Sequence, residues 1–156
     1  MGNYNSIVGN NISGSERAIF LWSSMNNTII ANNITNNDYG IIVSRTVNPG
    51  PDSSDNKIFH NNFRGNTQNV RIDIYEGVNY WDNGYPSGGN YWSDYTGVDS
   101  NHDGIGDTSY IIDSNNRDRF PLMKPYIVPE YPLVILLLFM TVTLFVFIFY
   151  KRKHLI

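Results

Sequence analysis

The sequence predicts an all-β protein built as a parallel β-solenoid, in which the chain winds into about three stacked coils. The first observation behind this prediction is a threefold internal repeat of asparagine and apolar positions. The aligned sets are Asn5, Asn27 and Asn56; Ile7, Ile29 and Ile58; Asn10, Asn32 and Asn61; and Ile12, Ile34 and Phe63. Their spacing is 22 residues and then 29, because seven residues are inserted around positions 48–52. A fixed period of this length is typical of solenoids.

The second observation is the type of residue that repeats. Short runs rich in β-branched side chains, such as Gly40 to Val43, are separated by Asn and Gly, which favours strands and turns over helices. Equivalent residues in stacked parallel strands lie about 4.8 Å apart, so repeated Asn side chains can form hydrogen-bonded ladders. An Asn-rich tail without a fold is the alternative, but the apolar positions keep their register as strictly as the Asn positions do.

The chain divides into five segments. We expect β-helix repeats over residues 1–76, an aromatic and Asp-rich cap over 77–126, a linker over 127–132, a transmembrane helix over 133–150 and a basic tail over 151–156. Residues 133–150 carry no charge and are close to the length that crosses a membrane. Because Lys151, Arg152 and Lys153 follow at once, we expect a single-pass protein of the cell membrane with its N-terminal part outside and its C-terminus in the cytoplasm.

Composition narrows the choice of partners. The chain has 156 residues and no Cys, which excludes disulfides and thiolate sites. Without the three basic residues of the tail, 8 basic side chains stand against 14 acidic ones, which argues against a nucleic-acid partner. The N-terminus shows no signal peptide and no capping element. We therefore expect a C-terminal piece of a longer secreted protein whose missing N-terminal β-helix segment is a partner; the alternative is a short protein that stacks on another chain.

Aromatic residues gather directly after the repeats. Two Asn-Tyr-Trp triplets place large rings at Tyr80, Trp81, Tyr91 and Trp92. Such rings can cover the end of an apolar solenoid core. They can also stack on the faces of sugar rings, so a carbohydrate-binding platform is the second interpretation.

A third stretch has the spacing of a calcium loop. Oxygen side chains fall at positions 1, 3, 5 and 9 with Gly104 at position 6. The predicted Ca²⁺ ligands are Asp99, Asn101, Asp103, the carbonyl of Ile105 and Asp107. Position 12 is Tyr110, where an EF-hand has a bidentate Glu, and Asp94 or Asp113 is a candidate to take the place of that Glu. The alternative interpretation is an Asp/Asn-Gly turn without a metal.

The repeats, followed by three motifs, resemble a known family. The motifs are Gly-Gly-Asn-Tyr-Trp-Ser-Asp-Tyr (88–95), Asp-Gly-Ile-Gly-Asp-Thr-Ser-Tyr (103–110) and Arg-Phe-Pro-Leu-Met-Lys-Pro (119–125). Together they resemble the C-terminal part of archaeal surface proteins of the right-handed parallel β-helix class, known as NosD-type periplasmic copper-binding proteins or as carbohydrate-binding and sugar-hydrolysis domains. Residues 128–132, the apolar span and the basic cluster resemble the PEF-CTERM tails that sortase-like enzymes process. The resemblance implies a right-handed coil and a cell-surface location.

The residue types argue against two of the activities that this resemblance implies. Copper sites use clusters of His, Met or Cys, whereas His60, His102 and His154 lie far apart in the sequence. No catalytic triad or paired acid is visible, so the sequence does not identify an enzyme.

The sequence thus predicts a membrane-anchored extracellular β-helix module with a structural or adhesive role. The alternative is a fragment that binds or processes a surface polysaccharide. Three sequons, at Asn11, Asn26 and Asn33, mark candidate glycosylation sites.

Overall fold

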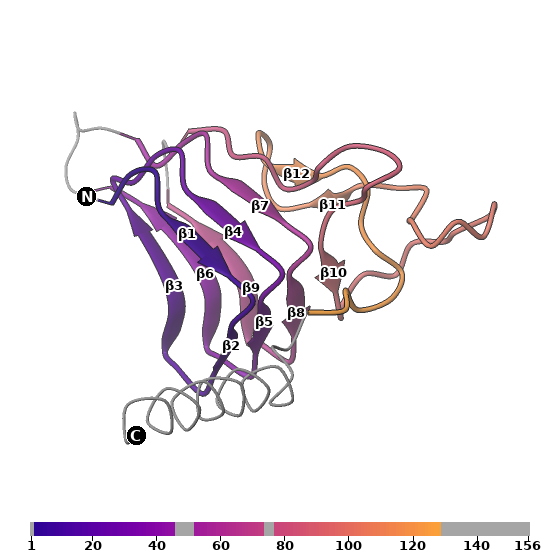
Figure 1. Cartoon of the computed structure of the whole chain (residues 1–156), viewed down its shortest axis with the longest axis horizontal. Coiled ribbons are helices and arrows are strands. Elements are labelled where there is room, and N and C mark those ends of the chain that lie inside the picture. The colour runs from indigo at the N-terminus through magenta and orange to yellow at the C-terminus, as the bar shows by residue number, and fades with distance from the viewer. Residues whose placement is uncertain (1, 46–51, 74–76, 129–156) are drawn as a thin grey trace, which may run out of the picture.

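Three sheets of parallel strands form the walls of the solenoid. The computed structural model describes residues 2–45, 52–73 and 77–128 (Figure 1). The first sheet holds β1 (Ser6–Val8), β4 (Thr28–Ile30) and β7 (Lys57–Phe59). The second holds β2 (Asn11–Ser13), β5 (Asn33–Thr35), β8 (Asn62–Arg64) and β10 (Tyr91–Trp92). The third holds β3 (Arg17–Trp22), β6 (Tyr39–Ser44) and β9 (Gln68–Ile72).

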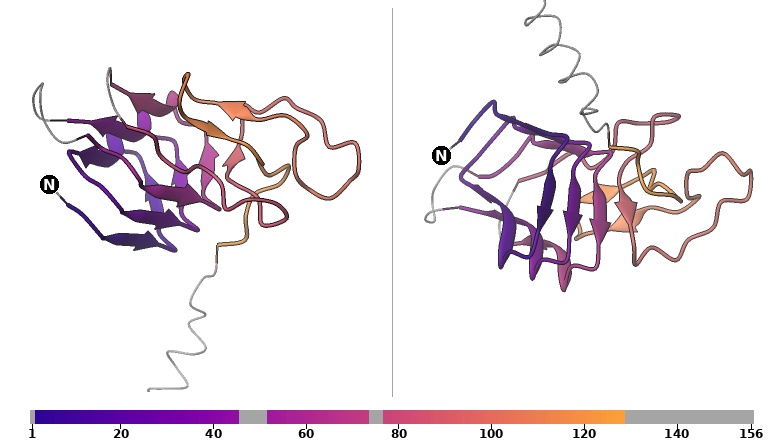
Figure 2. Two further views of the ribbon diagram at one scale, coloured as in Figure 1. Left: turned by 90° about the horizontal axis from the view of Figure 1, so that it is seen from above. Right: turned by 60° about the horizontal axis from the view of Figure 1, so that its bottom comes forward.

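The strand register follows the sequence repeat, and the predicted all-β parallel coils are confirmed. Ile7 pairs with Ile29 and Ile29 with Ile58, while Ile12 pairs with Ile34 and Ile34 with Phe63. Equivalent strands lie side by side along the stack, with the cap at the end opposite the N-terminus (Figure 2). In the cap, β11 (Tyr110–Ile111) and β12 (Arg117–Asp118) form an antiparallel pair.

Each corner of a coil is turned by a residue with positive φ. These residues are Tyr4, Asn26 and Asp55; Gly9, Ala31 and His60; and Gly14, Asn36 and Gly65. They recur with the repeat, and most stand directly before an Asn. The left-handed conformation is unfavourable for Ala, Tyr and His, so the stacked coils must supply the energy that holds them there.

The core lies inside the three sheets and ends in aromatic rings. Ile29, Ile34, Ile41 and Ile58 are completely buried. Beneath them the rings of Phe63, Trp92 and Tyr110 stack in sequence, with centroids 4.3 Å and 4.2 Å apart. The aromatic residues therefore close the apolar interior at the cap end, as the first interpretation of the aromatic triplets expects.

The predicted membrane span lies outside the described residues. Within residues 2–45, 52–73 and 77–128, no helix is both long enough and apolar enough to cross a membrane. The predicted span over 133–150 and tail over 151–156 fall beyond residue 128, as does most of the predicted linker.

The register makes a prediction about stability. Ile34 is completely buried between Ile12 and Phe63 in the second sheet. An Ile34→Asn substitution would leave an amide in the apolar core and should lower the free energy of unfolding by roughly 2–5 kcal/mol. Thermal unfolding of the full chain measures this. The neighbouring Thr35→Asn, which points to the other face of the strand, should change stability by less than about 1 kcal/mol, and equal melting temperatures for both variants would contradict the register.

Candidate functional site

Three columns of Asn side chains run through the corners of the coils. In each column, a backbone N–H and usually an Nδ2–H donate to the Oδ1 of the residue one coil later, over 2.8–3.1 Å. Ladder 1 consists of Asn5, Asn27, Asn56, Asn79 and Asn116. Ladder 2 consists of Asn10, Asn32, Asn61, Asn90 and Asp118. Ladder 3 begins with the backbone N–H of Ser15, passes through Asn37 and Asn66 one coil apart, and continues to Asn69, which lies three residues after Asn66.

The ladders have a direction, and each ends on a carboxylate. The bonds between rungs run toward the cap, whereas Nδ2–H groups such as those of Asn32 and Asn61 also donate to carbonyls of the preceding coil. The last rung therefore needs an acceptor, and an ionised Asp is such a group. Asp118 accepts the N–H of Asn90 at 2.6 Å and ends ladder 2. Asp113 accepts the Nδ2–H of Asn116 at 3.2 Å and ends ladder 1. Asp94 accepts the Nδ2–H of Asn69 at 2.9 Å and ends ladder 3.

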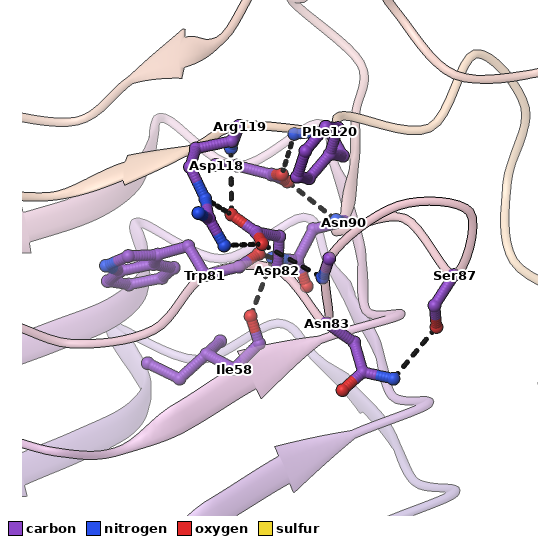
Figure 3. A network of polar contacts seen from close by, with 10 residues as sticks. Ile58, Trp81, Asp82, Asn83, Ser87, Asn90, Asp118, Arg119 and Phe120 are labelled. Carbon is purple, nitrogen blue, oxygen red and sulfur yellow. Dashed lines mark hydrogen bonds and ion pairs between the residues drawn. The ribbon is translucent and has the colours of Figure 1, made fainter.

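Asp118 is completely buried, whereas Asp113 is half-buried and Asp94 is exposed. Figure 3 shows Asp118 beside Asn90 and Phe120. Its Oδ2 also accepts the indole N–H of Trp92 at 2.9 Å, and its Oδ1 accepts the N–H of Phe120 at 3.0 Å. Burial raises the pKa of Asp118 to about 6, against the opposing effect of these hydrogen bonds. A Cβ at position 89 would collide with this carboxylate, so Gly89 is the residue that fits there.

A second carboxylate beside Asp118 is paired with a cation. Arg119 donates to Asp82 from Nε at 3.0 Å, from Nη2 at 2.7 Å and from its backbone N–H at 3.0 Å (Figure 3). Burial raises the pKa of Asp82, but the hydrogen bonds from Arg119 and Gly84 outweigh burial and leave that pKa lowered. This pair ties β12 to the chain after the first Asn-Tyr-Trp triplet.

The predicted calcium loop is drawn together by hydrogen bonds of its own. Asp99 accepts the N–H groups of Asp103 and Gly104, at 3.1 Å and 2.9 Å. Asp103 accepts the N–H of Ile105 and the Nδ2–H of Asn101, both at 2.9 Å.

Asp107 is hydrogen-bonded to Ser100 and not to the other predicted Ca²⁺ ligands. It accepts the N–H and the hydroxyl of Ser100, at 2.9 Å and 2.6 Å. The described part of the chain holds no group of three or more His, Asp or Glu that could bind a metal ion. The loop is thus a hydrogen-bonded turn. Calcium binding by the predicted ligands stays a prediction.

The four rings of the sugar-stacking prediction differ in how far they are exposed. Trp81 and Trp92 are each only 1% exposed. Because Trp92 lies between Phe63 and Tyr110, its faces are unavailable to a sugar. Tyr80 is 52% exposed and Tyr91 is half-buried, so a role for these two rings stays a prediction.

The three candidate glycosylation sites differ in their surroundings. Asn11 and Asn26 are exposed, whereas Asn33 is half-buried. The Nδ2–H of Asn33 donates to Oδ1 of Asn11 at 2.7 Å, and its own Oδ1 accepts from Asn62 at 2.7 Å. Asn11, Asn33 and Asn62 form an outer ladder on the second sheet. Glycosylation stays a prediction at each sequon.

Sequence reasoning missed the residues that end the ladders. Asp118 belongs to none of the predicted sites, and Asp94 and Asp113 only flank the predicted calcium loop. A signal was present, because Asp118 follows Asn90 by 28 residues, close to the spacing between successive rungs of ladder 2. Ladder 2 ends at Asp118, where an Asp stands in place of the Asn of the earlier rungs.

The fold and the ladders define the class of this protein as a parallel β-helix. Residues 1–97 match the family model described as periplasmic copper-binding protein (NosD). The chain is 37% identical over 117 residues to the probable ABC transporter binding protein NosD of Stutzerimonas stutzeri, and 36% identical over 117 residues to that of Pseudomonas aeruginosa. This chain therefore belongs to the NosD family.

The relatives are much longer than this chain. The two matches cover 74% of this chain but only 24% and 25% of the relatives. No solved structure matches the chain. The NosD resemblance is confirmed by these matches, while the archaeal source and the sorting tail stay predictions.

The family membership corrects the prediction that argued against copper. The family is described as copper-binding, so the wide spacing of His in the sequence is not a sufficient reason to set copper aside. In residues 2–45, 52–73 and 77–128, however, His60 engages the carbonyl of Ser87 at 2.8 Å and stacks on Tyr126 with centroids 4.3 Å apart, while His102 lies in the exposed turn before Gly104.

The ladder end yields a prediction for Asp118→Ala. This substitution would leave the N–H groups of Asn90, Trp92 and Phe120 without their acceptor in a buried place. At pH 5, where wild-type Asp118 is largely protonated, the free energy of unfolding should fall by at least about 2 kcal/mol. Chemical denaturation of the full chain measures the loss. Asp38→Ala, at an exposed position, is the matched control, and equal losses would contradict the role of Asp118.

The pKa of Asp118 yields a prediction for pH. This pKa is raised from 3.8 to about 6, so the folded state binds the proton more readily than the unfolded state. The resulting stabilisation is fully present below the unfolded pKa and is lost as pH rises through the folded one. Lowering the pH from 7 to 5 should therefore raise the free energy of unfolding by roughly 1 kcal/mol.

The matched variant for this measurement is Asp118→Asn, which has no proton to take up in this range. Its stability should change less than that of the wild type between pH 7 and pH 5. The pKa values of Asp82, Asp103 and Asp107 are lowered, so their contributions are lost only at lower pH. An identical pH response in the wild type and the variant would show that another group is responsible.

Proposed function

We propose that this chain is a membrane-anchored, extracytoplasmic module of the NosD family with a structural or adhesive role. The observation that carries the proposal is the ending of ladders 1, 2 and 3 on Asp113, Asp118 and Asp94. A solenoid whose last rungs are satisfied in this way is closed at one end. The description of the family as periplasmic supports a location outside the cytoplasm.

An adhesive role is supported by the outer face of the third sheet. Phe20 and Trp22 are 39% and 49% exposed, and their rings stack with centroids 5.5 Å apart. The guanidinium of Arg17 lies 5.5 Å from the centroid of the Phe20 ring. Exposed aromatic rings beside a cation are frequent at contact surfaces.

Anchoring is supported by the sequence after the described residues. The uncharged run 133–150 has the length of a membrane span, and Lys151, Arg152 and Lys153 follow it. We propose that this run holds the module at the membrane with the coils outside and the basic tail inside.

Polysaccharide binding or processing is the second candidate, and one observation favours it. The exposed ring of Tyr80 lines a hollow of about 190 Å³ together with Arg117, Asp82 and Arg119, and Arg117 would suit an acidic sugar there because Arg119 is already paired with Asp82. Incubating the full chain with acidic polysaccharides separates the candidates. Cleavage would favour an enzyme, and retention that Tyr80→Ala abolishes would favour a binding module.

The names of the relatives point to a role together with a transporter. Both are probable ABC transporter binding proteins. Because this chain spans about a quarter of their length, we propose no transport step for it.

The anchoring proposal predicts a protease pattern in intact cells. Protease added outside should destroy an epitope in the coils and spare one placed after Ile156, because basic residues stay on the cytoplasmic side. Immunoblots of full-length chain tagged at either position measure this. Permeabilised cells are the control, in which both epitopes should be lost. Loss of the C-terminal epitope alone in intact cells would overturn the orientation.

A further inference from the structure

The last described residues are fastened to the outside of the second sheet, at the coil that holds β7, β8 and β9. The side chain of Asn62 binds the backbone of Tyr126 in both directions: its Oδ1 accepts the N–H at 2.7 Å, and its Nδ2–H donates to the carbonyl at 2.9 Å. The ring of Tyr126 stacks on His60, with centroids 4.3 Å apart. Figure 2 shows this end of the described chain beside the start of β8. The residues just before the predicted span are therefore held at one corner of the coils.

This corner, which is turned by Gly9, Ala31 and His60, carries two outward rows of side chains along the stack. The neighbouring residues of each strand point into the core, so these rows point outward. The row on the first sheet is apolar and the row on the second sheet consists of amides, and both are paired in register: Val8, Ile30 and Phe59; Asn11, Asn33 and Asn62.

The apolar character continues into the residues that are fastened there. Ile127 directly follows Tyr126 and is 88% exposed, and Val8 is 55% exposed. We name the two outward rows, together with Tyr126 and Ile127, the corner strip. Apolar side chains beside an aromatic ring and a row of amides are the combination that suits the boundary between water and lipid.

The charges around the corner strip are positive. Arg64 lies two residues after Asn62, and Lys124 lies two residues before Tyr126; both are exposed. Among residues 2–45, 52–73 and 77–128, neither has a carboxylate within ion-pair distance. The six strands that meet at this corner contain no Asp or Glu, although acidic residues outnumber basic ones in the chain. A negatively charged surface would therefore be attracted to this corner.

We propose that the corner strip lies on the lipid headgroups of the membrane that anchors this chain. This inference rests on the anchoring proposed above. The seven steps along the chain from Tyr126 to Leu133, where the uncharged run begins, can cover at most about 25 Å. The corner strip is thus within reach of the lipid surface, where Arg64 and Lys124 would meet headgroup phosphates. The fastening involves β8 and the residues after the cap, so it is independent of what lies before the first coil.

The test uses the absence of native Cys. The full chain, with a fluorophore on a single introduced Cys, is reconstituted in phosphatidylcholine vesicles whose headgroups carry a nitroxide quencher. Ile127→Cys reports on anchoring, and Val8→Cys reports on the far end of the corner strip. Val98→Cys in the cap and Trp22→Cys on the third sheet are exposed controls away from this corner. The fluorophore should be quenched at positions 127 and 8 and should keep its emission at positions 98 and 22.

The two proposals can fail separately in this experiment. Quenching at position 127 without quenching at position 8 would overturn the membrane contact of the corner strip and leave the anchoring standing. Absence of quenching at position 127 would overturn both. Equal quenching at positions 8, 22 and 98 would show that the coils have no preferred side toward the membrane, which would also overturn this proposal.

The role of the cations is tested by adding phosphatidylglycerol to the vesicles. Anionic lipid should increase the quenching at position 8, and the double substitution Arg64→Gln and Lys124→Gln should abolish that increase. The matched control is Arg17→Gln with Arg71→Gln, which removes two cations from the third sheet and should preserve the increase. An increase that survives the first pair of substitutions, or that the control pair also abolishes, would overturn the assignment of headgroup binding to this corner.

Discussion

The structure depends on one constraint, which is that a buried amide must find a hydrogen-bond partner. A solenoid with Asn at its corners meets this constraint by making each side chain the partner of the next coil. The completely buried Asn32, for example, accepts from Asn10 and donates to Asn61. An amide without such a partner in an apolar interior is costly. The ladders therefore hold the coil register, because a shift of one residue would leave every rung unpaired.

The same constraint explains the strained corners. Ala31 and His60 hold positive φ directly before Asn32 and Asn61. This conformation turns the chain so that the following Asn side chain points along the stack. At this corner the residue is Gly9, Ala31 or His60, while the residue after it is Asn in each coil. The corner conformation is therefore explained by the hydrogen bond that the following Asn makes in its ladder.

A directional ladder also creates two different ends. The end that still donates must meet an acceptor, and the cap supplies carboxylates there at the cost of burying Asp118, whose pKa is raised accordingly. The rings of Trp81 and Trp92 close the apolar interior beside it. The cap therefore finishes the end of the stack toward which the ladder bonds run.

The sequence by itself determined the coils, because a period of 22 residues repeats both the apolar core positions and the Asn positions, and stacking converts such a period directly into contacts. It also indicated where the coils end, through the two Asn-Tyr-Trp triplets. Only the tertiary structure decided what those aromatic residues do: Trp81 and Trp92 turn inward, and Tyr80 turns outward. The same holds for the ladder ends, because Asp94 and Asp113 lie outside the regular strands and Asp118 lies in β12, which is not part of the stacked coils. Their partners are fixed by which donors the last coil leaves unpaired, and that becomes defined only when the coils are stacked.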